Sequence, residues 1–296
     1  MVSRAELFKK VRGLIAERDE DTADFDTTCI FQDMLGERFP MLAPEEPVPD
    51  EKAAEILFLA QRRSQGWPLQ YLLGQWEFWG CNFKVGEGVL IPRPDTETLV
   101  EQVLDICRRE RLTAPKIADL CSGSGCIAVA LKKELPQADI YAVELSEKAL
   151  PYLRQNTVLN GCGDIHIIHG DVLLRDTARS LMGLDILVSN PPYLTSQDMK
   201  ELQTEVTHEP PSALFGGEDG LGFYRAITEL WNISVKDGGF IAYEFGMGQH
   251  DAVKDILENN GFADVELRRD GGGIIRTAAA VKHWMYDSGL RRQKKG

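Results

Sequence analysis

The residues Asn190, Pro191, Pro192 and Tyr193 combine hydrogen-bond acceptors with a flat aromatic ring. Two consecutive prolines fix the backbone and remove two N–H donors, so the Asn190 side-chain oxygen and the carbonyls of Asn190 and Pro191 remain as a rigid rim of acceptors. A planar NH2 group would bring two donors to this rim, and Tyr193 offers a face on which it could stack. The same residues could instead form a simple proline turn, and the motif alone does not decide.

The apolar run LDILV, residues 184–188, comes directly before this motif. A strand that is apolar almost throughout is typical of a parallel sheet covered by helices on both faces. The loop after such a strand lies at the carboxyl edge of the sheet, where open α/β sheets bind their ligands. We therefore expect Asn190 and its neighbours to line a ligand site.

A glycine-rich turn follows an earlier apolar run, IADL, at residues 117–120. The turn consists of Cys121, Ser122, Gly123, Ser124 and Gly125. Its glycines allow a ligand to approach the backbone, and the helix expected from about Cys126 would offer free N–H groups. No GK[ST] follows, which disfavours a nucleoside triphosphate, and Ala128 replaces the third glycine of a dinucleotide fingerprint.

Two acidic residues end the next two predicted strands. Glu144 ends ADIYAVELS about twenty residues after the glycines, where an acid can accept hydrogen bonds from both hydroxyls of a ribose. Asp171 follows DIHIIHG and could accept from an adenine amino group, with Val172 packing on the ring. The ordered set of glycine turn, Glu144, Asp171 and Asn190 describes an S-adenosyl-L-methionine site better than an NAD site. The product would be S-adenosyl-L-homocysteine.

The block IPRPDTE, residues 91–97, places Arg93 and Glu97 on either side of a rigid loop. Its prolines predict a non-helical loop, and Thr96 or Asp95 could cap the helix that we expect to begin there. Arg93 and Glu97 could form a surface salt bridge or line the site. Their spacing does not choose between these roles.

The chain divides by periodicity and composition. In residues 1–72 apolar residues recur at spacings of three and four, which predicts helices. Three segments show this spacing, AELFKKVRGLIAERD, TTCIFQDMLGERF and DEKAAEILFLAQRRSQG, and acidic or proline-rich breaks separate them. We expect a helical domain that either recognises a partner or merely stabilises the rest of the protein. Strand and turn signals from 68 to 89 predict a hairpin, and we assign 73–90 to a β-hairpin linker. We assign 91–288 to the cofactor-binding domain and 289–296 to a basic tail.

The cofactor-binding domain should be a Rossmann-like α/β fold. IADL, ADIYAVELS, DIHIIHGDV and LDILV predict four strands, and after a polar loop and a helix GGFIAYEFG and GGGIIRTAAAVKH supply two more around the helix QHDAVKDILENNGF. These patterns mark six strands; we expect seven in all, with the last antiparallel.

Composition excludes several classes of function. The net charge of −13 is spread along the chain, whereas nucleic-acid binders usually display a basic field, so we expect no direct nucleic-acid binding. No apolar run is long enough for a membrane span or a signal peptide, and six scattered cysteines fit a reducing compartment, so we expect a cytoplasmic protein. His166 and His169 lie three apart on a strand and point to opposite faces, so we predict no metal site.

The chain resembles the release-factor glutamine methyltransferases of the HemK/PrmC type, nearly from end to end. The resemblance is carried by PLQYLLGQWEFWG, GVLIPRPDTETLVE, DLCSGSGCIAVAL, VELSEKAL, VSNPPYL, EPPSALFGGEDGLGFYR and GGFIAYEFG in the expected order. NPPY also occurs in adenine-N6 DNA methyltransferases, whereas IPRPDTE is characteristic of this family. The end of the chain matches less closely, although it keeps Arg276 in a glycine-containing final hairpin.

The resemblance implies a seven-stranded class I methyltransferase domain behind a helical domain that helps to hold a class 1 peptide chain release factor. The substrate would be the glutamine of its Gly-Gly-Gln motif, methylated at N5, and we expect a monomeric enzyme. Asn190, Pro191, Pro192 and Tyr193 would be the catalytic residues, and Asn190 would also touch the cofactor. The alternatives are methylation of a nucleobase amine at the same motif, or a binding protein that keeps the fold without catalysis.

Overall fold

A computed structural model describes residues 2–36 and 43–283, so the predicted basic tail at 289–296 lies outside the described residues. The chain divides into two compact units. The first contains Met1–Trp76, Val85–Glu87 and Leu202–Glu209. The second contains Glu77–Lys84, Gly88–Glu201 and Pro210–Gly296. The segment Leu202–Glu209 thus belongs to the first unit, although the sequence placed it within a continuous domain from 91 to 288.

The first unit is a helical bundle, as its periodicity predicts. Its elements are β1 (Val2–Ser3), α1 (Arg4–Ala16), α2 (Ala23–Leu35), β2 (Pro47–Val48), α3 (Asp50–Ser64) and α4 (Leu69–Leu73). Ser3 and Glu6 form a capping box that starts α1. The helices bury one apolar core that includes Leu7, Ile30 and Ile56. The acidic break between α1 and α2 is confirmed over residues 19–22, but its last residues open α2, because Asp24 and Asp26 in the first turn suit the positive end of the helix dipole.

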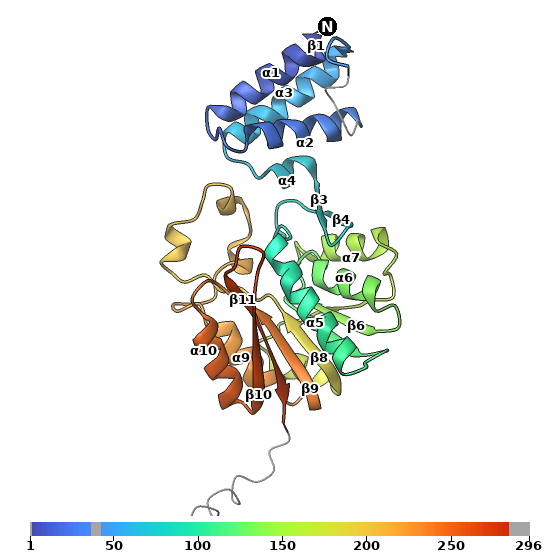
Figure 1. Ribbon diagram of the computed structural model, residues 1–296, viewed down its shortest axis with the longest axis vertical. Helices are drawn as coiled ribbons and strands as arrows, with labels where there is room; N and C mark the ends of the chain where they lie inside the picture. Colours follow the sequence, from blue (N-terminus) through green and yellow to red (C-terminus); the bar gives the residue numbers. More distant parts are fainter. Residues whose placement is uncertain (1, 37–42, 284–296) are drawn as a thin grey trace, which may run out of the picture. The chain divides into compact units, whose positions relative to one another are not determined.

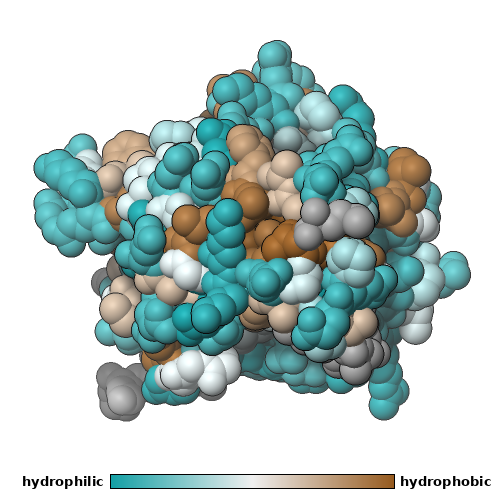
Figure 2. All heavy atoms as spheres, turned by 90° about the horizontal axis from the view of Figure 1, so that it is seen from above, coloured by the Kyte–Doolittle hydropathy of each residue, from teal (hydrophilic) through white to brown (hydrophobic). Residues whose placement is uncertain are grey.

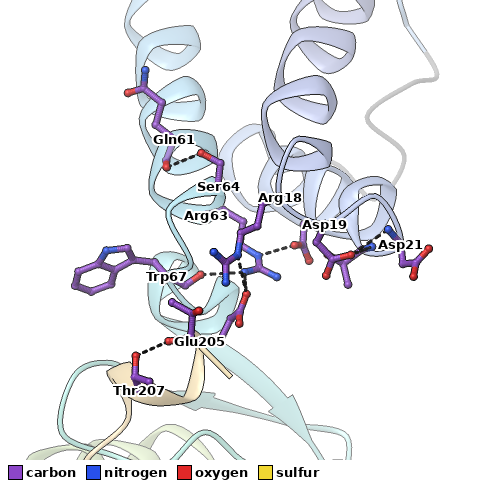
Figure 3. Close-up of polar contacts among 12 residues, drawn as sticks. Arg18, Asp19, Asp21, Gln61, Arg63, Ser64, Trp67, Glu205 and Thr207 are labelled. Atoms are coloured by element: carbon purple, nitrogen blue, oxygen red, sulfur yellow. Dashed lines mark hydrogen bonds and ion pairs between the residues drawn. The ribbon is translucent and has the colours of Figure 1, made fainter. Parts of the chain in front are cut away.

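The segment Leu202–Glu209, termed the returning segment, packs on the helical bundle through charged side chains (Figure 3). Arg63 on α3 donates to Asp26 at 2.6 Å and to Glu205 at 2.9 Å, and Arg18 donates to Glu205 at 3.2 Å. His208 stacks on Trp67 with ring centroids 4.4 Å apart. The side chains of Arg63 and Asp26 are only 8% and 5% exposed, so a buried ion pair within the bundle holds Arg63 in place for its contact with Glu205.

The hairpin begins later than the strand signals suggest. Residues Leu69–Leu73 form α4, and the paired strands that follow are β3 (Gln75–Phe78) and β4 (Cys81–Lys84). Trp79 and Gly80 at the turn both have positive φ, of 52° and 65°. Such a two-residue turn matches the twist of paired strands.

The second unit contains the predicted seven-stranded sheet (Figure 1). The strands are β5 (Lys116–Leu120), β6 (Asp139–Glu144), β7 (His166–His169), β8 (Leu184–Ser189), β9 (Val235–Glu244), β10 (Phe262–Arg269) and β11 (Ile275–Lys282). Their order is β10-β11-β9-β8-β5-β6-β7, and β11 runs antiparallel to both of its neighbours. The expected antiparallel last strand is therefore confirmed. No sequence pattern marked β10, whose sequence FADVELRR carries many charges.

Helices cover both faces of this sheet. They are α5 (Glu97–Arg109), α6 (Cys126–Glu134), α7 (Leu150–Leu159), α8 (Arg175–Ser180), α9 (Gly222–Trp231) and α10 (His250–Asn259). The connections through α6 and α7 lead toward β7, whereas those through α9 and α10 lead toward β10. Since parallel crossovers are right-handed, these two groups must lie on opposite faces. α5 packs with α6, and α8 packs with α9, which completes the two layers (Figure 1).

Short 3-10 turns fill the connections beside the sheet. They are η1 (Pro94–Thr96), η2 (Asp198–Lys200), η3 (Val206–His208) and η4 (Pro211–Ala213). η1 contradicts the expectation of a non-helical Pro-Arg-Pro-Asp loop, because a proline in the first turn has a φ that suits a helix and lacks only an N–H that would be unpaired there.

Hydrophilic side chains cover most of the face in Figure 2, with apolar ones in patches among them. Among residues 2–36 and 43–283, no helix is both long and apolar enough to cross a lipid bilayer.

Candidate active site

A cavity of about 270 Å³ opens at the carboxyl ends of the central strands β5, β6 and β8. It brings together residues from each motif predicted to form a site. These are Arg93, Cys121, Ser122, Gly123, Ser124, Glu144, Asp171, Val172, Asn190 and Pro192. Open α/β sheets bind ligands at this edge because the loops after parallel strands converge there.

The glycine-rich turn forms one wall of the cavity. Cys121 and Gly123 have positive φ values of 59° and 54°, so the backbone turns sharply between β5 and α6. Gly125, the last residue of the turn, is not part of the cavity wall. A Cβ atom at Gly125 would come within 2.4 Å of Leu153, which explains why a glycine is needed there. The Ser122 hydroxyl donates to the buried carboxylate of Asp119 at 2.8 Å and braces the turn.

The two acidic strand ends lie where the sequence predicts. Glu144 accepts hydrogen bonds from the backbone N–H groups of Gly123 at 2.7 Å and Ser146 at 2.6 Å. Asp171 accepts from the Leu173 N–H at 2.8 Å through Oδ1. Both residues line the cavity, and each has lone pairs left for a ligand, because an ionised carboxylate accepts about four hydrogen bonds. Glu144 suits a pair of ribose hydroxyls, and Asp171 with apolar Val172 suits an adenine ring.

The loop after β8 is held by backbone contacts that only glycines permit. A Cβ at Gly216 would lie 2.6 Å from the Pro192 carbonyl oxygen, and one at Gly220 would lie 2.3 Å from that of Tyr193. Gln249 donates to the Tyr193 carbonyl at 3.0 Å. The motif is therefore fixed by the block FGGEDGLG and by Gln249, the residue before α10, and the sequence did not indicate either contact.

The four motif residues do not share one environment. Asn190 and Pro192 line the cavity, whereas Pro191 and Tyr193 are not part of its wall. Pro191 is buried, and Tyr193 packs against the core beside the sheet. Burial, together with the carboxyl group of Glu244, raises the pKa of Tyr193 to about 12, so its phenol stays neutral at ordinary pH.

Thr96 contacts Asn190 rather than capping a helix. The expected cap by Thr96 or Asp95 is not formed: Thr96 stands at the N-cap position of α5 without a side-chain capping hydrogen bond, and Asp95 lies within η1. The Thr96 hydroxyl is buried and accepts a hydrogen bond from Asn190 Nδ2 at 3.3 Å. α5 begins directly from η1, which leaves that hydroxyl free to face the motif.

A buried carboxyl group lies behind this pair. Glu244, at the end of β9, is 1% exposed. Burial raises the pKa of Glu244 to about 7, although Thr96, Arg276 and Asn190 favour its ionised form. Arg276 on β11 is in turn paired with Asp270 at 3.1 Å. Sequence reasoning missed Thr96 and Glu244 as site residues, although IPRPDTE and YEFG contain them.

Arg93 and Glu97 separate in space. Arg93 lines the cavity, but Glu97 does not. Instead, Glu97 accepts a hydrogen bond at 2.9 Å from the Trp79 N–H at the hairpin turn. Of the two roles left open by the sequence, site lining therefore describes Arg93 alone.

The two histidines noted in the sequence have different surroundings. His166 stacks on Tyr141 and approaches Asp139 at 3.1 Å, whereas His169 contacts the Leu145 carbonyl at 3.1 Å. Among the residues that the structure describes, no group of three potential ligands is arranged to hold a metal ion.

Comparison with known proteins identifies the family. Residues 6–74 match the family model of the PrmC N-terminal domain, and residues 95–218 match that of the methyltransferase small domain. The chain is 40% identical over 243 residues to a release factor glutamine methyltransferase from Thermodesulfovibrio yellowstonii, covering 81% of this chain and 86% of that protein. It is 37% identical over 270 residues to one from Geobacter sulfurreducens, covering 90% and 92%.

Solved structures support the fold. A methyltransferase from Pyrococcus furiosus superposes with a TM-score of 0.53 at 14% identity, over 80% of this chain and all of that one. This likeness concerns the class I methyltransferase fold alone. With the fold, the assembled motifs and relatives matched over most of their length, the chain belongs to the release factor glutamine methyltransferase family.

Proposed function

We propose that this enzyme transfers a methyl group from S-adenosyl-L-methionine to the side-chain amide nitrogen N5 of the glutamine in the Gly-Gly-Gln motif of class 1 peptide chain release factors. S-adenosyl-L-homocysteine would be released. The observation that carries the proposal is the acceptor-rich motif around Asn190, held rigidly at the wall of a cavity that also presents Glu144 and Asp171. The family of the chain supports the same substrate.

The cavity residues fit the cofactor. Glu144 would accept hydrogen bonds from the ribose hydroxyls, Asp171 would accept from the adenine amino group, and Val172 would pack on the ring. The turn from Cys121 to Ser124 leaves room beside its backbone, since a Cβ at Gly123 would meet no atom within 4 Å. When bound, the cofactor supplies a methyl group already activated by its sulfonium, so the protein contributes position and electrostatics.

An amide nitrogen is a poor nucleophile because its lone pair is delocalised into the carbonyl. Asn190 Oδ1 and the Pro191 carbonyl would accept the two hydrogens of the substrate amide and hold its nitrogen in place. No residue that the structure describes donates a hydrogen bond to the Asn190 or Pro191 carbonyl oxygens. The same acceptors would stabilise positive charge that develops on the nitrogen. No strong base is needed, because the alkylated amide loses its proton readily.

Pro192 and Tyr193 would complete the substrate site by bracketing the amide plane. Pro192 already lines the cavity. Tyr193 lies outside the cavity wall, so the substrate amide would have to contact its ring from outside the cavity, next to the motif. Since its phenol is neutral, it would contribute an apolar face and no charge.

The proposal assigns the helical unit to release-factor recognition and Arg93 to the substrate side of the cavity. It also includes a monomeric enzyme acting in the cytoplasm without binding nucleic acid.

Replacing Asn190 tests the reaction directly. We expect Asn190→Ala to lower kcat on a release factor by roughly 100-fold, in the range seen when an electrostatic donor or acceptor at a reacting group is removed. Cofactor affinity should change by no more than about threefold. Transfer of labelled methyl to a release factor, with and without its Gly-Gly-Gln glutamine, measures the rate, and calorimetry measures the affinity.

The exposed Asn259 on α10 provides the matched control, and Asn259→Ala should keep the wild-type rate. An unchanged rate in Asn190→Ala would refute its role. Methylation that persists when the Gly-Gly-Gln glutamine is replaced would refute the proposed acceptor.

A further inference from the structure

Glu244 is a buried carboxyl group that the reaction described above does not use. Strands β8 and β9 are parallel with Ser189 opposite Tyr243, so Asn190 and Glu244 follow side by side at the sheet edge. Glu244 Oε2 has no hydrogen-bond partner among the described residues. Because an unpaired buried acceptor destabilises the fold, this carboxyl group calls for a function.

The hydrogen bonds around Glu244 have a fixed direction when it is ionised. A carboxylate can only accept hydrogen bonds, whereas the Thr96 hydroxyl can donate one and accept others. Interactions with the side chains of Thr96 and Asn190 both favour the ionised form of Glu244. Thr96 would turn its hydrogen toward Glu244, and its lone pairs would then remain for the NH2 group of Asn190. Asn190 Nδ2 indeed donates to Thr96 Oγ1, at 3.3 Å.

We infer that Glu244 is a positioning residue: with Thr96 it keeps the NH2 group of Asn190 turned away from the substrate and its Oδ1 available to accept. This inference rests on the proposed function, in which Oδ1 accepts a hydrogen of the substrate amide. If the Asn190 amide were reversed, its NH2 group would face the substrate NH2 group, and two sets of donors would oppose each other.

The variant Glu244→Gln keeps the size of the side chain but replaces a group that can only accept hydrogen bonds with an amide that can also donate. The glutamine NH2 group can donate to the Thr96 hydroxyl, which can then donate to Asn190 Oδ1, so the Asn190 amide is no longer held in one orientation. We expect kcat on a release factor to fall at least tenfold, with the Kd of the cofactor and the KM of the release factor within about twofold of wild type. Glu266→Gln, at an exposed position on β10, is the matched control and should keep the wild-type rate.

A substrate analogue distinguishes positioning from a general structural effect. A release factor with Gly-Gly-Glu in place of Gly-Gly-Gln presents a carboxylate, which needs donors. Wild type should bind this analogue more weakly than the unmethylated release factor, by roughly tenfold. In Glu244→Gln the ratio of the two affinities should fall or invert, because a reversed Asn190 amide can donate a hydrogen bond to the carboxylate of the Gly-Gly-Glu analogue. A variant that loses affinity for both ligands equally would contradict the inference.

Thr96 keeps the inference testable if Glu244→Gln fails to fold. We expect Thr96→Val to lower kcat by a similar factor, and Thr96→Ser, which keeps the hydroxyl, to retain a larger share of the rate. Equal rates in the two Thr96 variants would overturn the inference.

A pH profile gives a further measurement. The wild-type rate should rise as Glu244 ionises, and Glu244→Gln should lack that rise. The titratable groups that face Glu244 from neighbouring elements are Asp95, Cys126, Tyr193, Tyr224 and Arg276. The pKa values of Cys126, Tyr193 and Tyr224 are raised, so these three groups stay protonated between pH 5 and pH 8.

The methylation rate of the wild-type enzyme shows whether a negative result contradicts the proposed function or only the positioning role of Glu244. Absence of methylation of any release factor by wild type would overturn the proposed function. Methylation by wild type together with an unchanged rate in Glu244→Gln would overturn the positioning role alone.

Discussion

Burial of Glu244 gives a single residue a measurable effect on stability. Burial raises its pKa from 4.5 to about 7, although Thr96 and Arg276 favour the ionised form and so lower the pKa. Because the pKa in the folded state is the higher one, the stability contributed by Glu244 is fully present below pH 4.5 and is lost as the pH rises through 7. Ionised Glu244 therefore weakens the fold, by an amount on the order of 3 kcal/mol at pH 8.

We expect Glu244→Gln to gain stability relative to wild type as the pH rises. The difference in free energy of unfolding between the two proteins should shift in favour of the variant by up to about 3 kcal/mol between pH 5 and pH 8. Urea denaturation at both pH values measures it. A difference that is the same at both pH values would show that Glu244 titrates normally. The exposed variant Glu266→Gln should show no such shift.

At the scale of elements, the returning segment links the motif loop to the helical unit through the chain. It leaves the second unit after Glu201 and rejoins it at Pro210, beside Ser212 and Ala213 in the cavity wall. Its attachment depends on Glu205. Although burial opposes ionisation, the hydrogen bonds from Arg63 and Arg18 lower the pKa of Glu205 from 4.5 to about 2.

We expect Glu205→Gln to destabilise the helical unit by about 2 kcal/mol at pH 7, because a buried arginine loses one of two charged acceptors. Since the pKa of Glu205 is lowered on folding, its contribution is complete above pH 4.5 and is lost as the pH falls toward 2. The difference between Glu205→Gln and wild type should therefore shrink below pH 4.5. Thermal unfolding at pH 7 and pH 3.5 measures it, with the exposed helix position Glu55→Gln as the control. Equal stability of the Glu205 variant and wild type at pH 7 would contradict the anchoring role.

At the scale of the whole molecule, the net charge of −13 bears on which acceptors can approach. A protein with this charge repels polyanions, and phosphate contacts supply most of the affinity of nucleic-acid binders. We expect no transfer of labelled methyl to duplex DNA or to RNA under conditions in which a release factor is methylated. Excess DNA at 50 mM salt should lower the rate on the release factor less than twofold. Labelling of nucleic acid at a comparable rate would favour nucleobase methylation instead.

The sequence by itself determined the order of most elements and most of the residues that line the cavity. The apolar strands, the glycine turn and the acids Glu144 and Asp171 follow from local rules, because a parallel sheet brings the ends of its strands to one edge wherever the helices lie. The resemblance of IPRPDTE and NPPY to family blocks pointed to the same family that the comparisons identify.

Only the tertiary structure decided what surrounds the motif. Thr96 contacts Asn190 instead of capping α5, Glu97 turns to the hairpin, and Glu244 is placed beside Asn190 by strand register. The returning segment packs on helices from which it is more than a hundred residues away in the chain. Each of these depends on contacts between residues distant in sequence, and neither periodicity nor local propensity carries information about such contacts.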